Sequence, residues 1–236
     1  LDTCVSCKAC KSECPSNVDI ARFKAEFLQQ HYDVCGVPMK AFLIARLTEI
    51  QRLGTILPWF YNAVVRNRMT GGMLKRMLHF APERAIPTLY KTTLKHWLGR
   101  YRRKNRGEIV GRVFLFADEF TNYMDVEIGI KMIELLDRLG YEVIIPKHVE
   151  SGRTAISKGM LKVAKGVARK NVLLLKSWVT ENIPLVGIEP SCILSFRDEY
   201  PDLVGDDLKE EALRLGKNCL LYDEFFTREI RAGRIR

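Results

Sequence analysis

Four cysteines lie within the first fourteen residues, and their spacing is the most specific chemical signal in the chain. Cys4, Cys7, Cys10 and Cys14 are followed by Pro15, which gives the run C-x2-C-x2-C-x3-C-P. Two intervening residues let one tight loop aim three thiolates at three irons of a 4Fe-4S cluster, while the fourth thiolate points away toward a second cluster. The sequence therefore predicts that these four cysteines are iron-sulfur ligands.

The ligand count requires a further motif. If Cys14 serves a second cluster, neither cluster has four ligands here, so we expect another C-x2-C-x2-C-x3-C run upstream of Leu1, in a longer protein. Tetrahedral zinc is the alternative, although zinc sites usually use two separated C-x2-C pairs. Cysteines spaced for a metal favour a reducing, intracellular compartment over disulfides. Cys35 is expected to be an ordinary thiol, and Cys219 a core residue.

Hydrophobic periodicity predicts the elements that position these thiols. Residues 20 to about 32 repeat at helical spacing, and residues 38 to 97 remain helical between glycine and proline breaks. From residue 112 the pattern alternates between strands and helices. The expected strands lie at 113–116, 141–145, 183–188 and 218–222, and the expected helices at 125–139 and 154–178. This order indicates a parallel sheet with helices on both faces.

The expected class is thus α+β: an N-terminal half-ferredoxin cluster loop and helical segment, then a C-terminal α/β parallel-sheet domain. We expect the cluster motif and its helix in residues 1–37, a basic helical linker domain in 38–110 and the α/β domain in 111–236. Of the formal charge of +10, residues 1–110 carry 19 Lys and Arg against 8 Asp and Glu, whereas the remainder carries 19 against 20. The positive excess therefore belongs to the first half.

A basic half can meet an anionic membrane surface or an acidic partner subunit, or it can be a solvated helical face. We exclude nucleic acid because no motif that reads DNA or RNA is present. Residues 53–65 are uncharged and include Trp59, Phe60 and Tyr61. They are too short to span a bilayer, so they are a candidate surface for resting on a membrane or lining a quinone approach. The alternative is packing in the core or docking onto another domain. The chain shows no signal peptide, which predicts a cytoplasmic protein, at most peripheral to the inner membrane.

A second set of candidate residues follows the predicted strands of the α/β half. Glu189 and Cys192 lie at a strand-to-helix turn, where a helix N-terminus favours a thiolate. Glu150 and Arg153 follow another strand. Sites in parallel sheets form beyond the carboxyl ends of strands, so these four residues are a candidate secondary site. The alternative for Cys192 is a packed structural cysteine.

The run from Cys4 to Asp19, together with Gly187 to Cys192, resembles the iron-sulfur part of FAD-linked 2-hydroxy acid dehydrogenases. That group includes D-lactate and D-2-hydroxyglutarate dehydrogenases and the iron-sulfur subunits of glycolate oxidase and anaerobic glycerol-3-phosphate dehydrogenase. The resemblance implies a ferredoxin part joined to a cysteine-rich domain. It also implies that Cys4, Cys7 and Cys10 hold one 4Fe-4S cluster and Cys14 a second, with two clusters in the full-length protein.

The same resemblance implies electron relay from a flavin toward quinone or another acceptor, with FAD on an upstream domain or a partner subunit. The chain would then be the electron-transfer portion of an oxidoreductase, with no catalytic residue of its own. One departure stands out, because Glu150-Ser151-Gly152-Arg153 occupies the stretch where related domains commonly carry Cys-Cys-Gly-Arg. We therefore expect no cluster in residues 111–236. Two other interpretations remain open: a zinc-stabilised or metal-free interaction module, and a thiol or heterodisulfide enzyme centred on Cys192.

Overall fold

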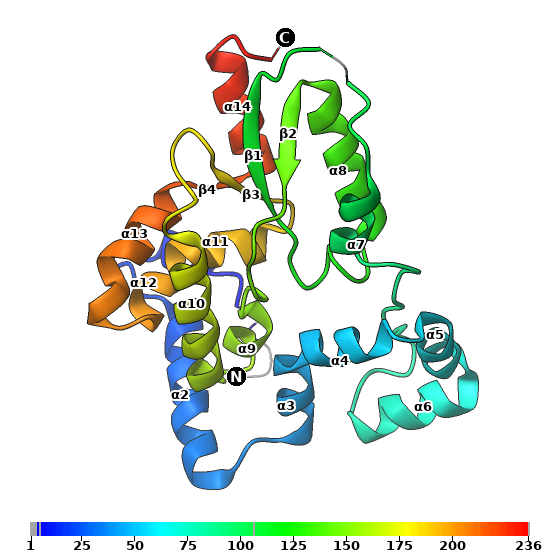
Figure 1. Cartoon of the computed structure of the whole chain (residues 1–236). Coiled ribbons are helices and arrows are strands. Elements are labelled where there is room, and N and C mark those ends of the chain that lie inside the picture. The colour runs from blue at the N-terminus through cyan, green and yellow to red at the C-terminus, as the bar shows by residue number, and fades with distance from the viewer. Residues whose placement is uncertain (1–3, 5, 106, 236) are drawn as a thin grey trace.

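A four-stranded parallel sheet forms the centre of the second half of the chain (Figure 1). The computed structural model describes residues 4, 6–105 and 107–235. The strands follow the order β2-β1-β3-β4, so the chain reverses its direction of winding at β1. The strands are β1 Gly111–Phe116, β2 Tyr141–Ile144, β3 Leu185–Gly187 and β4 Cys219–Leu221. Their register pairs Val113 with Val143, Leu115 with Val186, and Val186 with Leu220.

Helices cover both faces of this sheet, which confirms the predicted layering. On one face, Phe114 and Phe116 pack in a buried cluster with residues of α10, α11 and α13. On the other face, Val113 and Val186 pack against α8 and α14. The helices of this half are α8 Val126–Arg138, α9 Arg153–Ser157, α10 Leu161–Leu175, α11 Pro190–Asp198, α12 Tyr200–Leu203, η1 Asp206–Leu208, α13 Lys209–Lys217 and α14 Tyr222–Arg231.

The first half contains helices but no strands where it is described, and residues 80–93, which were expected to be helical, form turns and irregular chain instead. Its helices are α1 Ala9–Glu13, α2 Ile20–Cys35, α3 Met39–Ala45, α4 Leu47–Gly54, α5 Pro58–Arg66, α6 Arg68–Met77 and α7 Leu94–Arg100. Helix α2 lies beside α10, α3 contacts α9, and α7 packs on α8. Helices α5 and α6 contact each other and lie away from the sheet (Figure 1). In the described part of the chain, no helix combines the length and apolar character needed to cross a bilayer.

One predicted element is divided in two. Periodicity predicted a single helix over residues 154–178, but the structure ends α9 at Ser157 and begins α10 at Leu161. Gly159 lies between them with a left-handed φ of 71°, which a helix cannot contain. A Cβ atom at Gly159 would lie 2.3 Å from the Cβ of Leu28. The break therefore allows α2 to approach the α/β half closely.

Candidate cluster-binding segment and its contacts

The cysteine segment is a tight turn followed by the short helix α1. Ser6 and Lys8 have left-handed φ angles of 57° and 62°, so the chain bends on both sides of Cys7. Cys10 lies in α1, and Cys14 directly follows it with an extended backbone. Cys7 and Cys10 are exposed, Cys4 and Cys14 are half-buried, and all four are free thiols. The predicted ligands are therefore accessible from outside.

Backbone N–H groups surround the thiol of Cys14. Val18, Ser16 and Asn17 donate hydrogen bonds to it and lower its pKa below the ordinary value. A thiolate is the form that binds iron, so this environment favours the ligand state. Within the described ranges, no three Cys, His, Asp or Glu side chains lie close enough together to hold one metal ion. Free thiols, one of them with a lowered pKa, are the ligand type that an iron-sulfur cluster uses, but the described thiols do not converge on one point.

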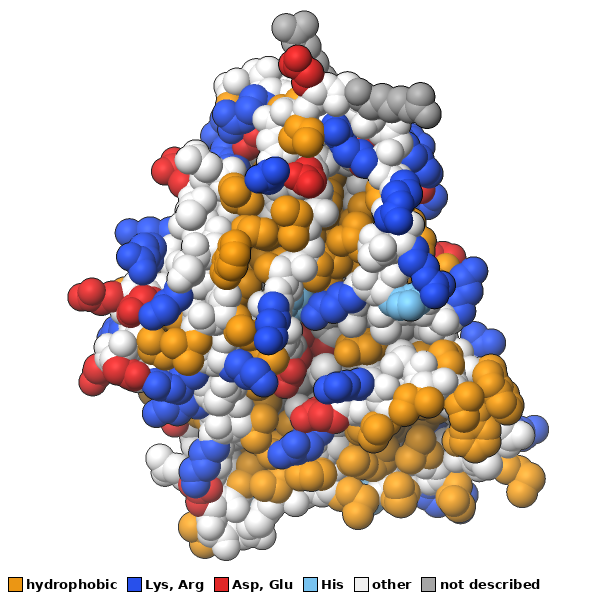
Figure 2. Space-filling model, viewed as in Figure 1, with side chains coloured by type: hydrophobic (Ala, Val, Ile, Leu, Met, Phe, Trp, Pro, Cys, Tyr) orange, Lys and Arg blue, Asp and Glu red, His pale blue; other side chains and the backbone are white. Residues whose placement is uncertain are grey.

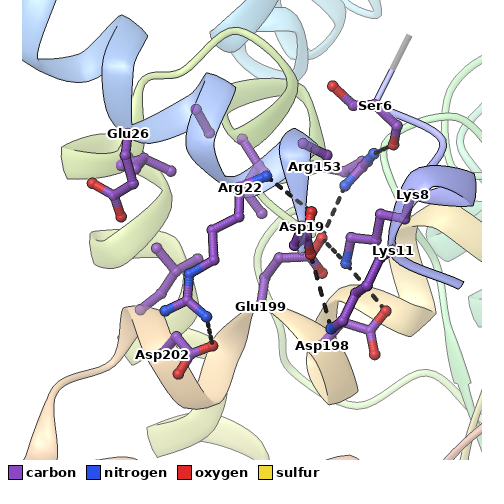
Figure 3. A pocket seen from close by; sticks show the side chains of 15 residues that line it. Ser6, Lys8, Lys11, Asp19, Arg22, Glu26, Arg153, Asp198, Glu199 and Asp202 are labelled. Atoms are coloured by element: carbon purple, nitrogen blue, oxygen red, sulfur yellow. Dashed lines mark hydrogen bonds and ion pairs between the residues drawn. The ribbon is translucent and has the colours of Figure 1, made fainter. Parts of the chain in front are cut away.

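Charged side chains join the cysteine segment to the α/β half (Figure 3). Arg153, at the start of α9, donates through Nη2 to the carbonyl oxygen of Ser6 at 3.2 Å and through Nη1 to Glu199 Oε1 at 3.1 Å. The same oxygen of Glu199 lies 2.7 Å from Lys8 Nζ, which also bonds Asp198 at 3.2 Å. Burial lowers the pKa of Lys8, but the carboxylates of Glu199 and Asp198 outweigh it and raise the pKa overall. Lys8 is thus held as a cation.

Helix α2 extends this interface past the cysteine segment. Asp19 caps the helix by accepting a hydrogen bond from the Arg22 N–H at 3.0 Å. The Arg22 guanidinium reaches Asp202 at 2.8 Å, and Lys162 reaches Asp33 at 2.7 Å near the other end of α2. Asp19, Arg22 and Asp202 border a cleft of about 90 Å³ between α2 and helices α11 and α12 (Figure 3). Opposite charges on facing elements therefore bring the two halves together.

Arg153, Glu150 and Glu189 of the predicted secondary site have different hydrogen-bond partners, although the charge of Glu189 contributes to the raised pKa of Cys192. Arg153 faces the cysteine segment, and Glu150 is half-buried, its carbonyl oxygen accepting a hydrogen bond from Asn171 at 2.7 Å. Glu189 caps α11, accepting hydrogen bonds from the N–H of Ser191 at 3.3 Å and from its hydroxyl at 2.7 Å. The structure thus gives Arg153 and Glu189 separate structural contacts.

Cys192 contradicts the expectation of a thiolate. Its side chain is fully buried, and burial together with the charges of Glu119 and Asp118 raises its pKa far above the ordinary value. The N-terminus of α11 favours a thiolate, but the loss of hydration that a buried thiolate suffers is the larger effect. Cys192 is therefore a packed, protonated thiol, and Cys219 is likewise fully buried, as predicted.

A buried polar group around Glu119 was missed by sequence reasoning. The Glu119 carboxylate accepts hydrogen bonds from the N–H of Ser151 at 2.9 Å and from its hydroxyl at 2.6 Å. The Tyr200 hydroxyl donates to the carbonyl oxygen of Ser151 at 2.8 Å. Burial raises the pKa of Glu119 to about 7. The position of Glu119, just beyond the carboxyl end of an apolar strand, was a sequence signal for a site. Its partner Ser151 is 32 residues away, so the pair could not be recognised from the sequence.

Comparison with known proteins finds similarity to dehydrogenases. The chain is 24% identical over 227 residues to D-2-hydroxyglutarate dehydrogenase of Escherichia coli (strain K12), covering 93% of this chain and 22% of that protein. It is 24% identical over 197 residues to one subunit of the anaerobic glycerol-3-phosphate dehydrogenase of the same strain, covering 83% of this chain and 49% of that subunit. Lactate utilization protein A of Macrococcus caseolyticus is 30% identical over 102 residues, covering 43% of this chain and 40% of that protein.

These relatives confirm the resemblance that the sequence motifs carried. The chain spans about a fifth of the length of the D-2-hydroxyglutarate dehydrogenases it matches. No protein-family model matches the chain, and no solved structure matches it significantly.

Proposed function

We propose that this chain is the iron-sulfur, electron-transfer part of a flavin-linked 2-hydroxy acid dehydrogenase. The observation that carries the proposal is the C-x2-C-x2-C-x3-C-P run in a chain whose relatives are named as dehydrogenases. Cys4, Cys7 and Cys10 would hold one 4Fe-4S cluster, and Cys14 would be a ligand of a second. When bound, such a cluster passes one electron at a time between the flavin and an acceptor.

The chain's own residues supply ligands, charge and a surface for docking. Backbone N–H groups favour the Cys14 thiolate, and the contacts of Arg153 and Lys8 fix the loop on the α/β half. The exposure of Cys7 and Cys10 leaves one side of the loop open to a partner. In this proposal, FAD and the substrate site lie on a flavin dehydrogenase domain or subunit.

The remaining parts of the proposal concern the whole protein. Residues 1–37 would carry the cluster, 38–110 would form a basic helical linker and 111–236 an α/β scaffold. The acceptor would be quinone or another carrier, reached from the cytoplasmic side of the inner membrane. A thiol enzyme centred on Cys192 receives no support, because that thiol is buried and protonated.

Metal analysis of full-length protein purified without oxygen tests the proposal. We expect bound iron and sulfide and, after reduction, an electron paramagnetic resonance signal of 4Fe-4S clusters. Cys10→Ser should lower the bound iron by about half, because one of two clusters loses a ligand. Cys35→Ser is the matched control, since Cys35 is also exposed but lies outside the motif. Iron-free wild-type protein would refute the proposal, and stoichiometric zinc in its place would support the interaction module.

A further inference from the structure

The contact between Arg153 and the cysteine segment has a role beyond joining two halves of the chain. We propose that Arg153 and Glu199 are positioning residues that hold the cluster-binding loop in shape and balance the charge beside it. This inference rests on the proposed function and deepens it. We call Arg153, Glu199 and Lys8 the Arg153 clamp.

The clamp is a connected set of contacts with little solvent around it. Arg153 bonds both the Ser6 carbonyl oxygen, at 3.2 Å, and Glu199, at 3.1 Å, and Glu199 bonds Lys8 at 2.7 Å. The side chains of Arg153, Glu199 and Lys8 are 17%, 16% and 24% exposed. Charge-assisted hydrogen bonds shielded in this way are stronger than exposed surface pairs. The clamp therefore constrains the loop more than the exposed pairs along α2 do.

The position of these contacts explains why they would matter to the ligands. Ser6 and Lys8 are the two left-handed residues on either side of Cys7. A left-handed residue other than glycine is strained, so the loop relaxes unless its surroundings hold it. Arg153 binds the carbonyl oxygen of Ser6, and Glu199 binds the side chain of Lys8. It thereby fixes the chain direction before and after the thiol that these two residues flank.

The clamp also sets the charge near the loop. Arg153 and Lys8 supply two positive charges, and Glu199 and Asp198 supply two negative ones. Neutralising one member leaves an excess of the opposite sign. An excess of negative charge opposes the addition of an electron to a nearby cluster, whereas an excess of positive charge favours it. Changes at the two ends of the clamp should therefore have opposite effects on the reduction potential.

Potentiometric titration of the cluster-loaded, full-length protein tests this prediction. We expect Arg153→Gln to lower the midpoint potential and Glu199→Gln to raise it, while Arg153→Lys, which keeps the charge, stays near the wild-type value. Asp202→Asn is the matched control, because it breaks the Arg22 pair at the same interface without a contact to the cysteine segment. Shifts in the same direction for Arg153→Gln and Glu199→Gln, or none for either, would overturn the electrostatic role.

Amide hydrogen exchange in cluster-free protein tests the clamp independently of iron. Exchange over residues 6–14 should be about ten-fold faster in Arg153→Gln than in wild type, since the variant loses a charge-assisted hydrogen bond. It should be unchanged in Asp202→Asn. Equal exchange in Arg153→Gln and wild type would refute the clamp. Absence of iron from wild-type protein would instead refute the proposed function. The hydrogen-exchange result would then still show whether Arg153 holds the loop.

Discussion

Glu119 is a carboxyl group inside the protein beside a hydroxyl, a thiol and the end of β1. It is 1% exposed, and burial raises its pKa to about 7. Asp118, its neighbour, is also buried and has a raised pKa for the same reason. The family resemblance implied a cysteine at the position of Ser151, and here the Ser151 hydroxyl donates to Glu119. A hydrogen-bonded acid therefore occupies the space next to Cys192.

The raised pKa of Glu119 makes stability depend on pH. Below about pH 4.5, Glu119 is protonated in both the folded and the unfolded protein. Between about pH 4.5 and 7, the unfolded chain loses this proton while the folded chain keeps it. Stability should therefore fall as pH rises through this window, by up to about 3 kcal/mol. Glu119→Gln should reduce this slope in urea unfolding measured across the window. The exposed Glu181→Gln should keep it, and equal slopes in wild type and Glu119→Gln would contradict the prediction.

At the level of helices and strands, a single glycine decides how α2 meets the α/β half. Gly159 separates α9 from α10 with a left-handed backbone, and its missing side chain makes room for Leu28 and for the carbonyl oxygen of Ala25. Gly166, in α10, has a helical backbone and open space around it among the described residues. The two glycines therefore have different physical reasons for their presence.

Substitution by alanine should separate these two roles. Gly159→Ala should destabilise the protein by about 1–3 kcal/mol, since it adds backbone strain and a Cβ atom 2.3 Å from Leu28. Gly166→Ala should be neutral or stabilise by up to about 1 kcal/mol, because alanine favours a helix. Urea unfolding of the two variants checks the difference. A loss of less than ~0.5 kcal/mol in Gly159→Ala would show that α2 does not pack as described.

Across the molecule as a whole, one surface is unusually apolar. Figure 2 shows apolar side chains gathered at the lower right, where Figure 1 places α5 and α6. Eight large apolar residues of this region are more than half exposed, and we call them the α4–α6 surface: Leu53, Ile56, Leu57, Trp59, Phe60, Met69, Met73 and Met77. Contiguous apolar surface of this kind marks an interaction site. The D-2-hydroxyglutarate dehydrogenases that the chain resembles are more than four times as long as this chain. In the proposed function, the flavin-bearing part lies outside this chain, and we take it as the candidate occupant of the surface.

We predict that the flavin-bearing part of the full-length protein covers the α4–α6 surface. Trp59 on this surface and Trp178 in the turn after α10 are 69% and 65% exposed, which makes them a matched pair. In hydroxyl-radical footprinting of the full-length protein, Trp59 should be labelled several-fold less than in this chain alone, whereas Trp178 should be labelled as before. Equal labelling of Trp59 in both would contradict the prediction, and protection that appears only with anionic vesicles would indicate a membrane contact.

Local patterns of residues were enough to predict the class of fold and the candidate ligands. Short apolar runs for buried strands and apolar residues at period 3.6 for helices are such patterns, so the parallel sheet with helices on both faces could be predicted from them. The spacing of Cys4 to Cys14 is equally local, because one loop carries all four thiols. A glycine within a helical pattern is compatible with a continuous helix or with a break, so the pattern did not decide at Gly159, and the close approach of Leu28, which is distant in sequence, is visible only in the structure.

Which charged groups meet and which are buried follows from packing and could not be predicted. The sequence placed Arg153 with Cys192, yet the fold turns its guanidinium toward Ser6, 147 residues away, and encloses Cys192 beside Glu119. Whether a carboxyl or thiol group is ionised depends on the solvent and partners that packing leaves to it. Those partners come from separate elements of the chain, so their arrangement exists only after the helices have docked on the sheet.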